Sequence, residues 1–358
     1  MSVFLEVETK KEKAIEGDFN VACFVLLTNN AGFNLPEGEN SYALDLLGKP
    51  MYEFITRVCP TKPITIECSE NDNPLEVVRP YLKDKDLTLV LYGDTPLLTR
   101  GNINNILNFV INRGLNVCKL TRGFVFKTDY IKRVDAIFAP QTYYFAEEEF
   151  KHPTNFGELA AISRVLERRI IDYHLSRGVR FIEANTCYVE SDVSIAGGAI
   201  IGPMVSLCGQ TQIADGAKIG ANTKIVSSSV GHNSVIGSGV ISNSVVQNNC
   251  IINENVVIAS QSFVGDNSVI ENGAIIENSS ISQNVKIGLG ATLKYAKIYR
   301  DAVVFEGAVV VGENEQPSRV LHGAKVGQNA TILKGVAIKE ETSVAPNSVI
   351  KKEDESKE

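Results

Sequence analysis

The sequence lacks the patterns that mark disulfide-rich, zinc-binding and membrane-spanning proteins. Its seven cysteines are scattered, odd in number and never spaced as Cys-x-x-Cys, which indicates reduced thiols rather than a disulfide framework or a zinc site. The four histidines are equally dispersed, so we expect no structural metal. No apolar run approaches the ~18 residues of a membrane span, and the first residues lack the long apolar stretch of a signal peptide. We therefore expect a cytoplasmic protein without a membrane partner.

The charge balance argues against a further class of partner. The 358 residues carry a formal net charge of −7 at pH 7, and the isoelectric point is near 5.4, so we do not expect a nucleic acid ligand. Hydrophobic residues make up 44% of the chain and charged residues 22%, as in an ordinary globular protein. The length predicts two domains that bury a sizeable core.

A short repeat fills the C-terminal part of the chain. Residues 189–349 divide without a break into 27 units that each begin with Ile, Val or Leu. Twenty units are six residues long, six are five residues long, and one (Val310–Val320) carries an insertion. In all 20 six-residue units the fifth residue is Ala, Val, Ser, Thr or Cys. This period fits neither a helix nor a hairpin, and it predicts a parallel β-helix of hexapeptide repeats with three units in each of about nine coils.

The N-terminal part alternates short apolar runs with helix-like stretches, which predicts an α/β domain with a mostly parallel sheet at residues 21–150. We expect strands at Val21–Leu27, Pro63–Cys68 and Leu87–Leu91, and helices at Met51–Val58, Leu75–Leu82 and Asn102–Asn112. The remaining divisions are a polar arm at 1–20, a helical connector at 151–188, the β-helix at 189–350 and a disordered tail at 351–358.

One expected strand leads directly into a carboxylate. Ligands of open parallel sheets bind at the carboxyl ends of the strands. Asp94 follows Gly93 at such an end, where its side chain is placed to hold a Mg²⁺ ion that bridges phosphates. The alternative interpretation is that Asp94 caps the turn before the next helix.

Several segments resemble the bacterial bifunctional enzymes that make UDP-N-acetylglucosamine. The resemblance lies in Leu47-Gly-Lys-Pro-Met51, in Tyr92-Gly-Asp-Thr-Pro-Leu97, and in the junction Leu166–Ile182 with Thr186–Val193. That family joins a uridylyltransferase domain to a left-handed β-helix acetyltransferase through a helical connector. The resemblance implies a reduced nucleotidyltransferase-like (Rossmann-like) α/β domain, a left-handed β-helix, a homotrimer and a role in UDP-N-acetylglucosamine biosynthesis. By the same resemblance, Asp94 and Asn155 match the Mg²⁺ ligands of the family.

The N-terminal domain departs from that family in its phosphate-binding loop. In the family, glycines after the first strand let backbone N–H groups reach the phosphates, and an Arg and a Lys neutralise charge during transfer. Here the segment Leu26–Pro36 keeps one glycine, Gly32, and no Arg or Lys follows before Leu47. The segment Thr121–Ile131 resembles a strand that lies near the end of the family's domain, but here it follows soon after Asp94. This short spacing implies that most of the family's sugar-binding lobe is deleted. We expect that uridylyl transfer has been lost.

The repeats depart from the family as well. They contain no Arg-Pro-Gly turn, no histidine between residues 233 and 321, and only two arginines. The insertion in Val310–Val320 is followed by His322, and histidine is the usual general base at neutral pH. We therefore predict a relocated acyltransfer site that uses His322 as base, binds substrate through Arg319, Lys294 and Lys297, and takes acetyl-CoA. The alternative is that His322 fills a corner of the coil and the insertion has no function.

Three functional hypotheses remain open on this basis. The first is an acyltransferase that acts on a small-molecule amino-sugar phosphate. The second is a pseudoenzyme that serves as a scaffold, a partner subunit or a nucleotide-sugar sensor. The third is a nucleotide-sugar enzyme that acts through Asp94 and Asn155. All three agree with a homotrimer, because a triangular prism packs naturally around a threefold axis.

Overall fold

The computed structural model describes residues 19–134, 142–145 and 147–352. The predicted arm at 1–20 and tail at 351–358 lie almost wholly outside the described residues. The chain divides into two compact units, Met1–Ile170 and Ile171–Glu358, called here the first and second unit. Among the described helices, none combines the length and the apolar character needed to cross a membrane.

The first unit is built on a five-stranded sheet with the strand order β4-β1-β5-β7-β6. The strands are β1 (Val21–Thr28), β4 (Ile64–Cys68), β5 (Leu87–Tyr92), β6 (Val117–Leu120) and β7 (Gly123–Lys127). A separate short hairpin joins β2 (Asp45–Leu46) and β3 (Lys49–Pro50). The three strands that we predicted from the sequence are confirmed to within a residue.

The three helices that we predicted in this unit are present, one of them divided, and the structure adds a short helix at Thr128–Ile131. The helices are α2 (Met51–Val58), α3 (Pro74–Val78), α4 (Arg100–Arg113) and α5 (Thr128–Ile131), with 3-10 turns η1 (Ala31–Phe33), η2 (Ser41–Ala43), η3 (Arg79–Tyr81) and η4 (Glu147–Phe150). The helix α6 (Phe156–Ser176) begins in this unit and ends in the second, because the boundary falls after Ile170. The helix predicted at Leu75–Leu82 is divided into α3 and η3. Pro80 is the physical reason, because its nitrogen carries no hydrogen and cannot donate the backbone hydrogen bond that would continue the α-helix.

The prediction of a parallel sheet is right for one half of the sheet and wrong for the other. Strand β1 pairs in parallel with β4 and β5, whereas β7 pairs antiparallel with β5 and β6. Only Thr121 and Arg122 connect β6 to β7. Two residues are enough for a hairpin but far too few for the crossover that a parallel pair requires.

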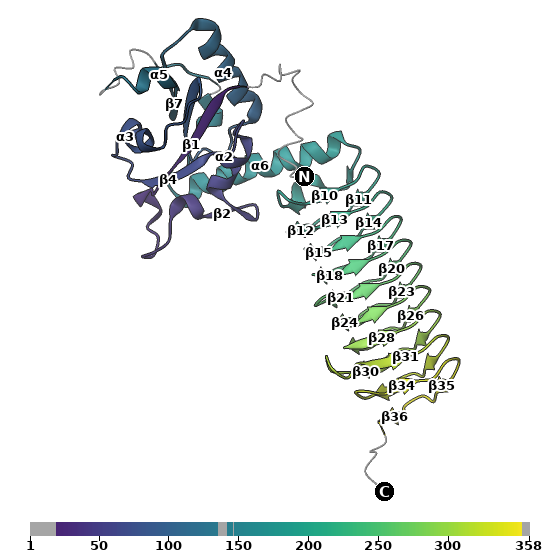
Figure 1. Ribbon diagram of the computed structural model, residues 1–358. Coiled ribbons are helices and arrows are strands. Elements are labelled where there is room, and N and C mark those ends of the chain that lie inside the picture. Colours follow the sequence, from purple (N-terminus) through teal and green to yellow (C-terminus); the bar gives the residue numbers. More distant parts are fainter. Residues whose placement is uncertain (1–18, 135–141, 146, 353–358) are drawn as a thin grey trace. The chain divides into compact units, whose positions relative to one another are not determined.

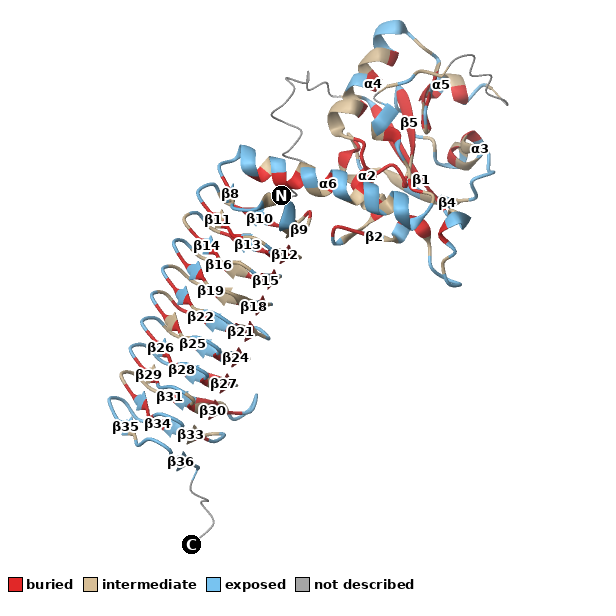
Figure 2. Ribbon diagram, turned by 180° about the vertical axis from the view of Figure 1, so that it is seen from behind, coloured by how far each residue is buried: buried red, intermediate tan, exposed pale blue. Residues whose placement is uncertain are grey.

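The sheet is covered on both faces, so its central strand is apolar throughout. All eight residues of β1 are buried. Alternate residues such as Cys23 and Val25 belong to a core that includes α2 and α4, while Phe24 and Leu26 belong to a second core that includes α3 and α5. The buried strands stand out in Figure 2.

The second unit is a parallel β-helix, as the repeat predicts (Figure 1). Each coil adds one strand to each of three parallel sheets, which we call faces I, II and III. Face I contains β10 (Ser194–Ile195), β13 (Gln212–Ile213), β16 (Ser229–Val230), β19 (Val245–Val246), β22 (Phe263–Val264), β25 (Ser280–Ile281), β28 (Ala296–Ile298), β31 (Ser318–Val320) and β34 (Ala337–Ile338).

Face II contains β8 (Arg180–Phe181), β11 (Ile200–Ile201), β14 (Lys218–Ile219), β17 (Val235–Ile236), β20 (Ile251–Ile252), β23 (Val269–Ile270), β26 (Lys286–Ile287), β29 (Val303–Val304), β32 (Lys325–Val326) and β35 (Ser343–Val344). Face III contains β9 (Tyr188–Val189), β12 (Ser206–Cys208), β15 (Thr223–Val226), β18 (Gly239–Ser242), β21 (Val256–Ala259), β24 (Ile275–Glu277), β27 (Thr292–Lys294), β30 (Val309–Val311), β33 (Thr331–Ile332) and β36 (Val349–Ile350). The 3-10 turn η5 (Ala184–Thr186) lies between β8 and β9. The sheets therefore begin at Arg180, before the predicted start at Val189, and the solenoid has about ten coils rather than nine.

Both positional rules of the repeat have a direct structural meaning. The first residue of a unit points into the prism, as Ile201, Leu207 and Ile270 do, and all three have an exposed fraction of 0%. After the insertion the inward position belongs to Val320, not to Leu321 as the division of the sequence predicts. The small fifth residue is buried where the chain turns, as at Ala217 and Ser268. A larger side chain at that corner would have no room, because the turn brings two faces of the narrow prism together.

The corner between faces I and II is formed by residues in the left-handed region. Asn233, Asn249, Asn267, Asn284 and Asp301 have φ between 55° and 59°. Asn and Asp tolerate this conformation better than other non-glycine residues. Their side chains also form a ladder, since Nδ2 of Asn267 donates to Oδ1 of Asn284 at 3.3 Å and Nδ2 of Asn284 donates to Oδ1 of Asp301 at 3.1 Å.

His174, in the last turn of α6, is buried in the second unit with an exposed fraction of 1%. Neither ring nitrogen has a hydrogen-bond partner among the described residues. Burial, with a contribution from the positive charge of Arg177, lowers the pKa of His174 from 6.5 to about 4. The folded chain therefore holds this ring neutral where an exposed histidine would be protonated.

Replacing His174 with Leu is expected to reduce the loss of stability in acid. Between pH 6.5 and about pH 4 the histidine is protonated in the unfolded chain but neutral in the folded chain, so the folded state loses stability as the pH falls through this window. The loss reaches on the order of 3 kcal/mol. The free energy of unfolding in urea, measured across this window, should fall more steeply for the wild type than for His174→Leu. Parallel curves would contradict the prediction.

Candidate functional site

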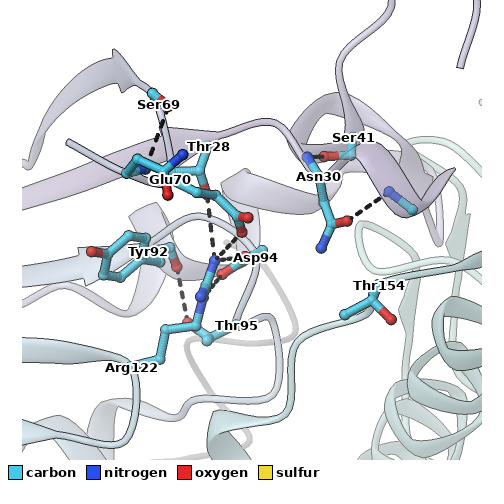
Figure 3. A network of polar contacts seen from close by, with 12 residues as sticks. Thr28, Asn30, Ser41, Ser69, Glu70, Tyr92, Asp94, Thr95, Arg122 and Thr154 are labelled. Atoms are coloured by element: carbon cyan, nitrogen blue, oxygen red, sulfur yellow. Dashed lines mark hydrogen bonds and ion pairs between the residues drawn. The ribbon is translucent and has the colours of Figure 1, made fainter. Parts of the chain in front are cut away.

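The carboxyl ends of the parallel strands in the first unit meet at an arginine. Figure 3 shows Arg122, from the turn between β6 and β7, among Thr28 at the end of β1, Glu70 beyond β4 and Asp94 beyond β5. Its Nε donates to Oδ1 of Asp94 at 2.7 Å, and its Nη2 donates to the other carboxylate oxygen. The same Nη2 is 3.2 Å from a carboxylate oxygen of Glu70 and 3.4 Å from the hydroxyl of Thr28. The guanidinium lies over the ring of Tyr92, 4.5 Å from its centre.

This bidentate pair occupies the position that the sequence assigned to a metal ion. The side chain of Asp94 is only 6% exposed, and both of its oxygens accept hydrogen bonds from Arg122. Burial lowers the pKa of Arg122, but the contacts with Asp94 and Glu70 outweigh this effect and raise it overall. A permanent cation thus neutralises Asp94 from within the chain.

The second predicted magnesium ligand, Asn155, has a different local role. Its Oδ1 accepts a hydrogen bond of 3.0 Å from the backbone N–H of Glu158, in the first turn of α6. In return, the carboxylate of Glu158 accepts from the backbone N–H and the hydroxyl of Thr154 at 2.8 and 2.9 Å. This reciprocal arrangement is typical of a helix N-terminus. Within the described part of the chain, no group of three or more His, Cys, Asp and Glu side chains is placed to hold a metal, and Asp94 and Asn155 do not fit a magnesium site.

A cleft of about 700 Å³ opens in the same unit. Its floor is apolar and includes Leu97, Phe150 and Ile162, which are at most 5% exposed, while its rim carries Glu147, Lys151 and other polar side chains. The volume falls within the range of small-molecule sites, which is roughly 300–1,000 Å³.

Breaking the arginine pair is expected to destabilise the first unit. Arg122→Met leaves Asp94 buried without a partner, which costs about 3 kcal/mol. The double variant Arg122→Met/Asp94→Leu removes both charges and should recover most of that loss. Unfolding in urea measures both effects, with Lys132→Met, which breaks an exposed ion pair with Asp84, as the control that leaves stability nearly unchanged. A double variant as unstable as the single one would show that the charge on Asp94 is not the cause.

In the second unit, the structure places most of the predicted acyltransfer residues together. Lys297 in β28 and Arg319 in β31 are register neighbours on face I, and both side chains are exposed. Arg300 and His322 follow them at the corner between faces I and II. We call Lys297, Arg300, Arg319 and His322 the basic cluster. Lys294 lies apart from it on face III, where its Nζ is 3.5 Å from the carboxylate of Glu277.

The ring of His322 has a defined orientation. Its Nδ1 is 3.1 Å from the carbonyl oxygen of Arg300 and 3.4 Å from Oδ2 of Asp301. A nitrogen that faces two acceptors carries the proton of the neutral ring, so Nε2 keeps its lone pair and is available as a base. His322 also fills a corner position, because its backbone carbonyl accepts from the N–H of Glu341. The two interpretations of this residue are therefore compatible.

The insertion between β30 and β31 packs against its own chain. The carboxylate of Glu313 is 3.0 Å from Nζ of Lys334, and the carbonyl of Gln316 accepts from the N–H of Gly335 at 3.1 Å. The hydroxyl of Ser318 contacts the carbonyl oxygens of Val311 and Leu333, each at 2.8 Å. These contacts fix the loop beside the following coil.

Arg122 and Arg300 are the two residues that sequence reasoning missed. Arg122 was visible as a cation in a short turn between two apolar stretches, but its pairing with Asp94 depends on the antiparallel hairpin. Arg300 stands three residues after Lys297, which is the same spacing that separates His322 from Arg319. That repeated spacing was the available signal.

Comparison with known proteins relates the repeats to one family. Residues 230–321 match the sequence model of a family described as GlmU-like, C-terminal hexapeptide. The bifunctional protein GlmU of Clostridioides difficile (strain 630) is 38% identical over 84 residues, which are 24% of this chain and 18% of that protein. GlmU of Lactobacillus johnsonii is 35% identical over 75 residues, which are 21% of this chain and 16% of that protein.

The chain thus spans less than a fifth of the length of these relatives, and the relationship holds for its C-terminal part. A solved structure described as UDP-N-acetylglucosamine acyltransferase aligns with 48% of this chain and 65% of its own, with 14% identity and a TM-score of 0.28.

Proposed function

We propose that the β-helix unit is a hexapeptide-type acyltransferase that moves an acetyl group from acetyl-CoA to the amine of an amino-sugar phosphate. The orientation of His322 carries this proposal, because Nδ1 is 3.1 Å from the carbonyl oxygen of Arg300 and Nε2 is left as a base. The match of residues 230–321 to a GlmU-like hexapeptide domain supports the reaction class.

The proposed reaction needs a proton acceptor and an anion-binding surface. Nε2 of His322 removes a proton from the acceptor amine while the amine nitrogen attacks the thioester carbonyl. The new C–N bond forms, the C–S bond breaks, and the departing thiolate takes the proton from the imidazolium. Asp301, whose Oδ2 is 3.4 Å from Nδ1, stabilises the imidazolium. Lys297, Arg300 and Arg319 hold the phosphate groups.

A homotrimer, a left-handed coil and a cytoplasmic location belong to the same proposal. The outward positions of face III are aliphatic at Val240, Val257, Ile275 and Val309. Val240 is 38% exposed and Ile275 is 39% exposed. Packing further copies against face III would remove this apolar surface from water.

A product assay by mass spectrometry tests the proposed reaction. The full chain is incubated with glucosamine-1-phosphate, acetyl-CoA, UTP and Mg²⁺, so that both products of the related family are detectable in one run. We expect N-acetylglucosamine-1-phosphate without UDP-N-acetylglucosamine. His322→Gln should lower the rate at least about 100-fold, because a positioned base contributes that much or more.

The matched control is His232→Gln. His232 also occupies the corner between faces I and II and has its Nδ1 against a carboxylate, that of Asp215, but it lies away from the basic cluster. Its loss should leave the rate unchanged. UDP-N-acetylglucosamine among the products would contradict the loss of uridylyl transfer, and the absence of both products would contradict acetyl transfer to this acceptor.

A non-catalytic role is the second candidate for the first unit, and Arg122 is the observation that favours it. Its bidentate pair with Asp94 supports the interpretation that nucleotidyl transfer has been lost. The cleft of about 700 Å³ supports a remaining role in binding, as in a nucleotide-sugar sensor. The same non-catalytic role without a ligand would be that of a scaffold or a partner subunit.

A further inference from the structure

A slot of about 500 Å³ opens on face I, in the coils that precede and include Lys297. The residues that line it come from four successive coils and from the corner beside them. They are Gln247, Phe263, Gly265, Asp266, Ser282, Gln283, Tyr299 and Arg300. None of these residues except Arg300 has a place in the reaction described above.

Two small residues, Gly265 and Ser282, form the floor of the slot. Gly265 and Ser282 are neighbours on successive coils of face I, at the position that Tyr299 occupies on the next coil. A Cβ atom at Gly265 would lie 2.6 Å from the backbone carbonyl carbon of Ser282 and 2.8 Å from the nitrogen of Gln283. Both are backbone atoms that cannot move aside, so position 265 accepts only glycine.

Two aromatic side chains bound this floor. Phe263, two residues before Gly265, is 38% exposed, and Tyr299, two coils further along the axis, is 39% exposed. Neither ring packs against another aromatic ring of the described chain. Exposed aromatic surface beside small and polar residues suits a planar ring, because stacking covers the apolar faces while polar groups reach the ring edge.

The positive charge lies at one end of the slot. The side chain of Arg300 is 61% exposed, and its Nε is 3.9 Å from Oδ2 of Asp301, so the guanidinium is available to an anion. Lys297 and Arg319 continue the charge along face I. Asp266 is the one carboxylate of the lining, and its Oδ1 already accepts from the backbone N–H and Nδ2 of Asn248 at 2.9 and 3.0 Å.

We infer that this slot binds a nucleoside phosphate. The base lies on the floor of Gly265 and Ser282, in contact with Phe263 and Tyr299, and the phosphate binds Arg300. The amides of Gln247 and Gln283 offer donors and acceptors to the edge of the base. The inference rests on the proposed function only for the origin of the nucleotide, which is either the adenosine 3′-phosphate part of an acyl-CoA donor or the uridine phosphate part of a nucleotide sugar.

Isothermal titration calorimetry on the full chain tests the inference without any need for turnover. The probes are adenosine 3′,5′-bisphosphate, UMP, adenosine and inorganic phosphate. Phe263→Ala and Tyr299→Ala should each weaken nucleotide binding about tenfold, since one base–aromatic stack is worth roughly 1–3 kcal/mol. Tyr299→Phe keeps the ring and should bind as the wild type does. Arg300→Gln should weaken the nucleotides and leave the affinity for adenosine unchanged.

The matched control is Phe305→Ala, which removes a phenylalanine that is 41% exposed beyond β29 on face II. It should leave nucleotide affinity unchanged, and thermal melts verify that every variant is folded. Stronger binding of adenosine 3′,5′-bisphosphate identifies the acyl donor as the source, and stronger binding of UMP identifies a nucleotide sugar.

Two results would overturn the inference. One is a wild type that binds no nucleotide at millimolar concentration, and the other is an equal loss of affinity in Phe305→Ala and Tyr299→Ala. Because the titration contains no acceptor amine, its outcome is independent of the acetyl-transfer assay. If the chain binds nucleotide but forms no product, the nucleotide slot is supported and the proposed acetyl transfer is contradicted.

Discussion

The hydrogen bonds between successive coils are the constraint on which the rest of the second unit depends. Backbone N–H groups of one coil donate to carbonyl oxygens of the next, as from Lys286 to Ala302 at 3.2 Å and from Val303 to Ala324 at 3.0 Å. They set a spacing of about 4.8 Å between strands. Because the register is fixed, each outward residue has a defined neighbour above and below it. The surface therefore consists of columns, and a site forms where neighbouring columns carry compatible side chains.

The basic cluster and the slot are two results of this arrangement. Lys297 and Arg319 are far apart in the sequence, yet their register places them side by side on face I. The same column carries Phe263 and Ser280 on earlier coils, so an aromatic surface leads into a positively charged one. The corner histidines show how much the columns matter, because His232 and His322 share a corner and a facing carboxylate but differ in the cations around them.

In the first unit, a side chain of the protein supplies the positive charge at the ends of the strands. Asp94 and Glu70 lie near the carboxyl ends of β5 and β4, where two carboxylates would repel each other without a cation between them. Arg122 supplies that cation from the β6–β7 turn. An arginine belongs to the chain and cannot leave as a metal ion can, so its charge holds the strand ends together permanently.

The sequence by itself determined the elements and the faces that they bury. Aliphatic residues at the start of the repeat units define what points into the prism, and the continuous apolar run of β1 defines a strand covered on both sides, because periodicity and burial are properties of neighbouring residues.

Only the tertiary structure decided which polar residues meet. The pairing of Asp94 with Arg122 depends on an antiparallel hairpin that the sequence was expected to fold in parallel. The orientation of His322 depends on the carbonyl of Arg300 in the preceding coil, and the separation of Lys294 from the cluster depends on which face its strand joins. Contacts of this kind are set by register between distant segments, which no local pattern contains.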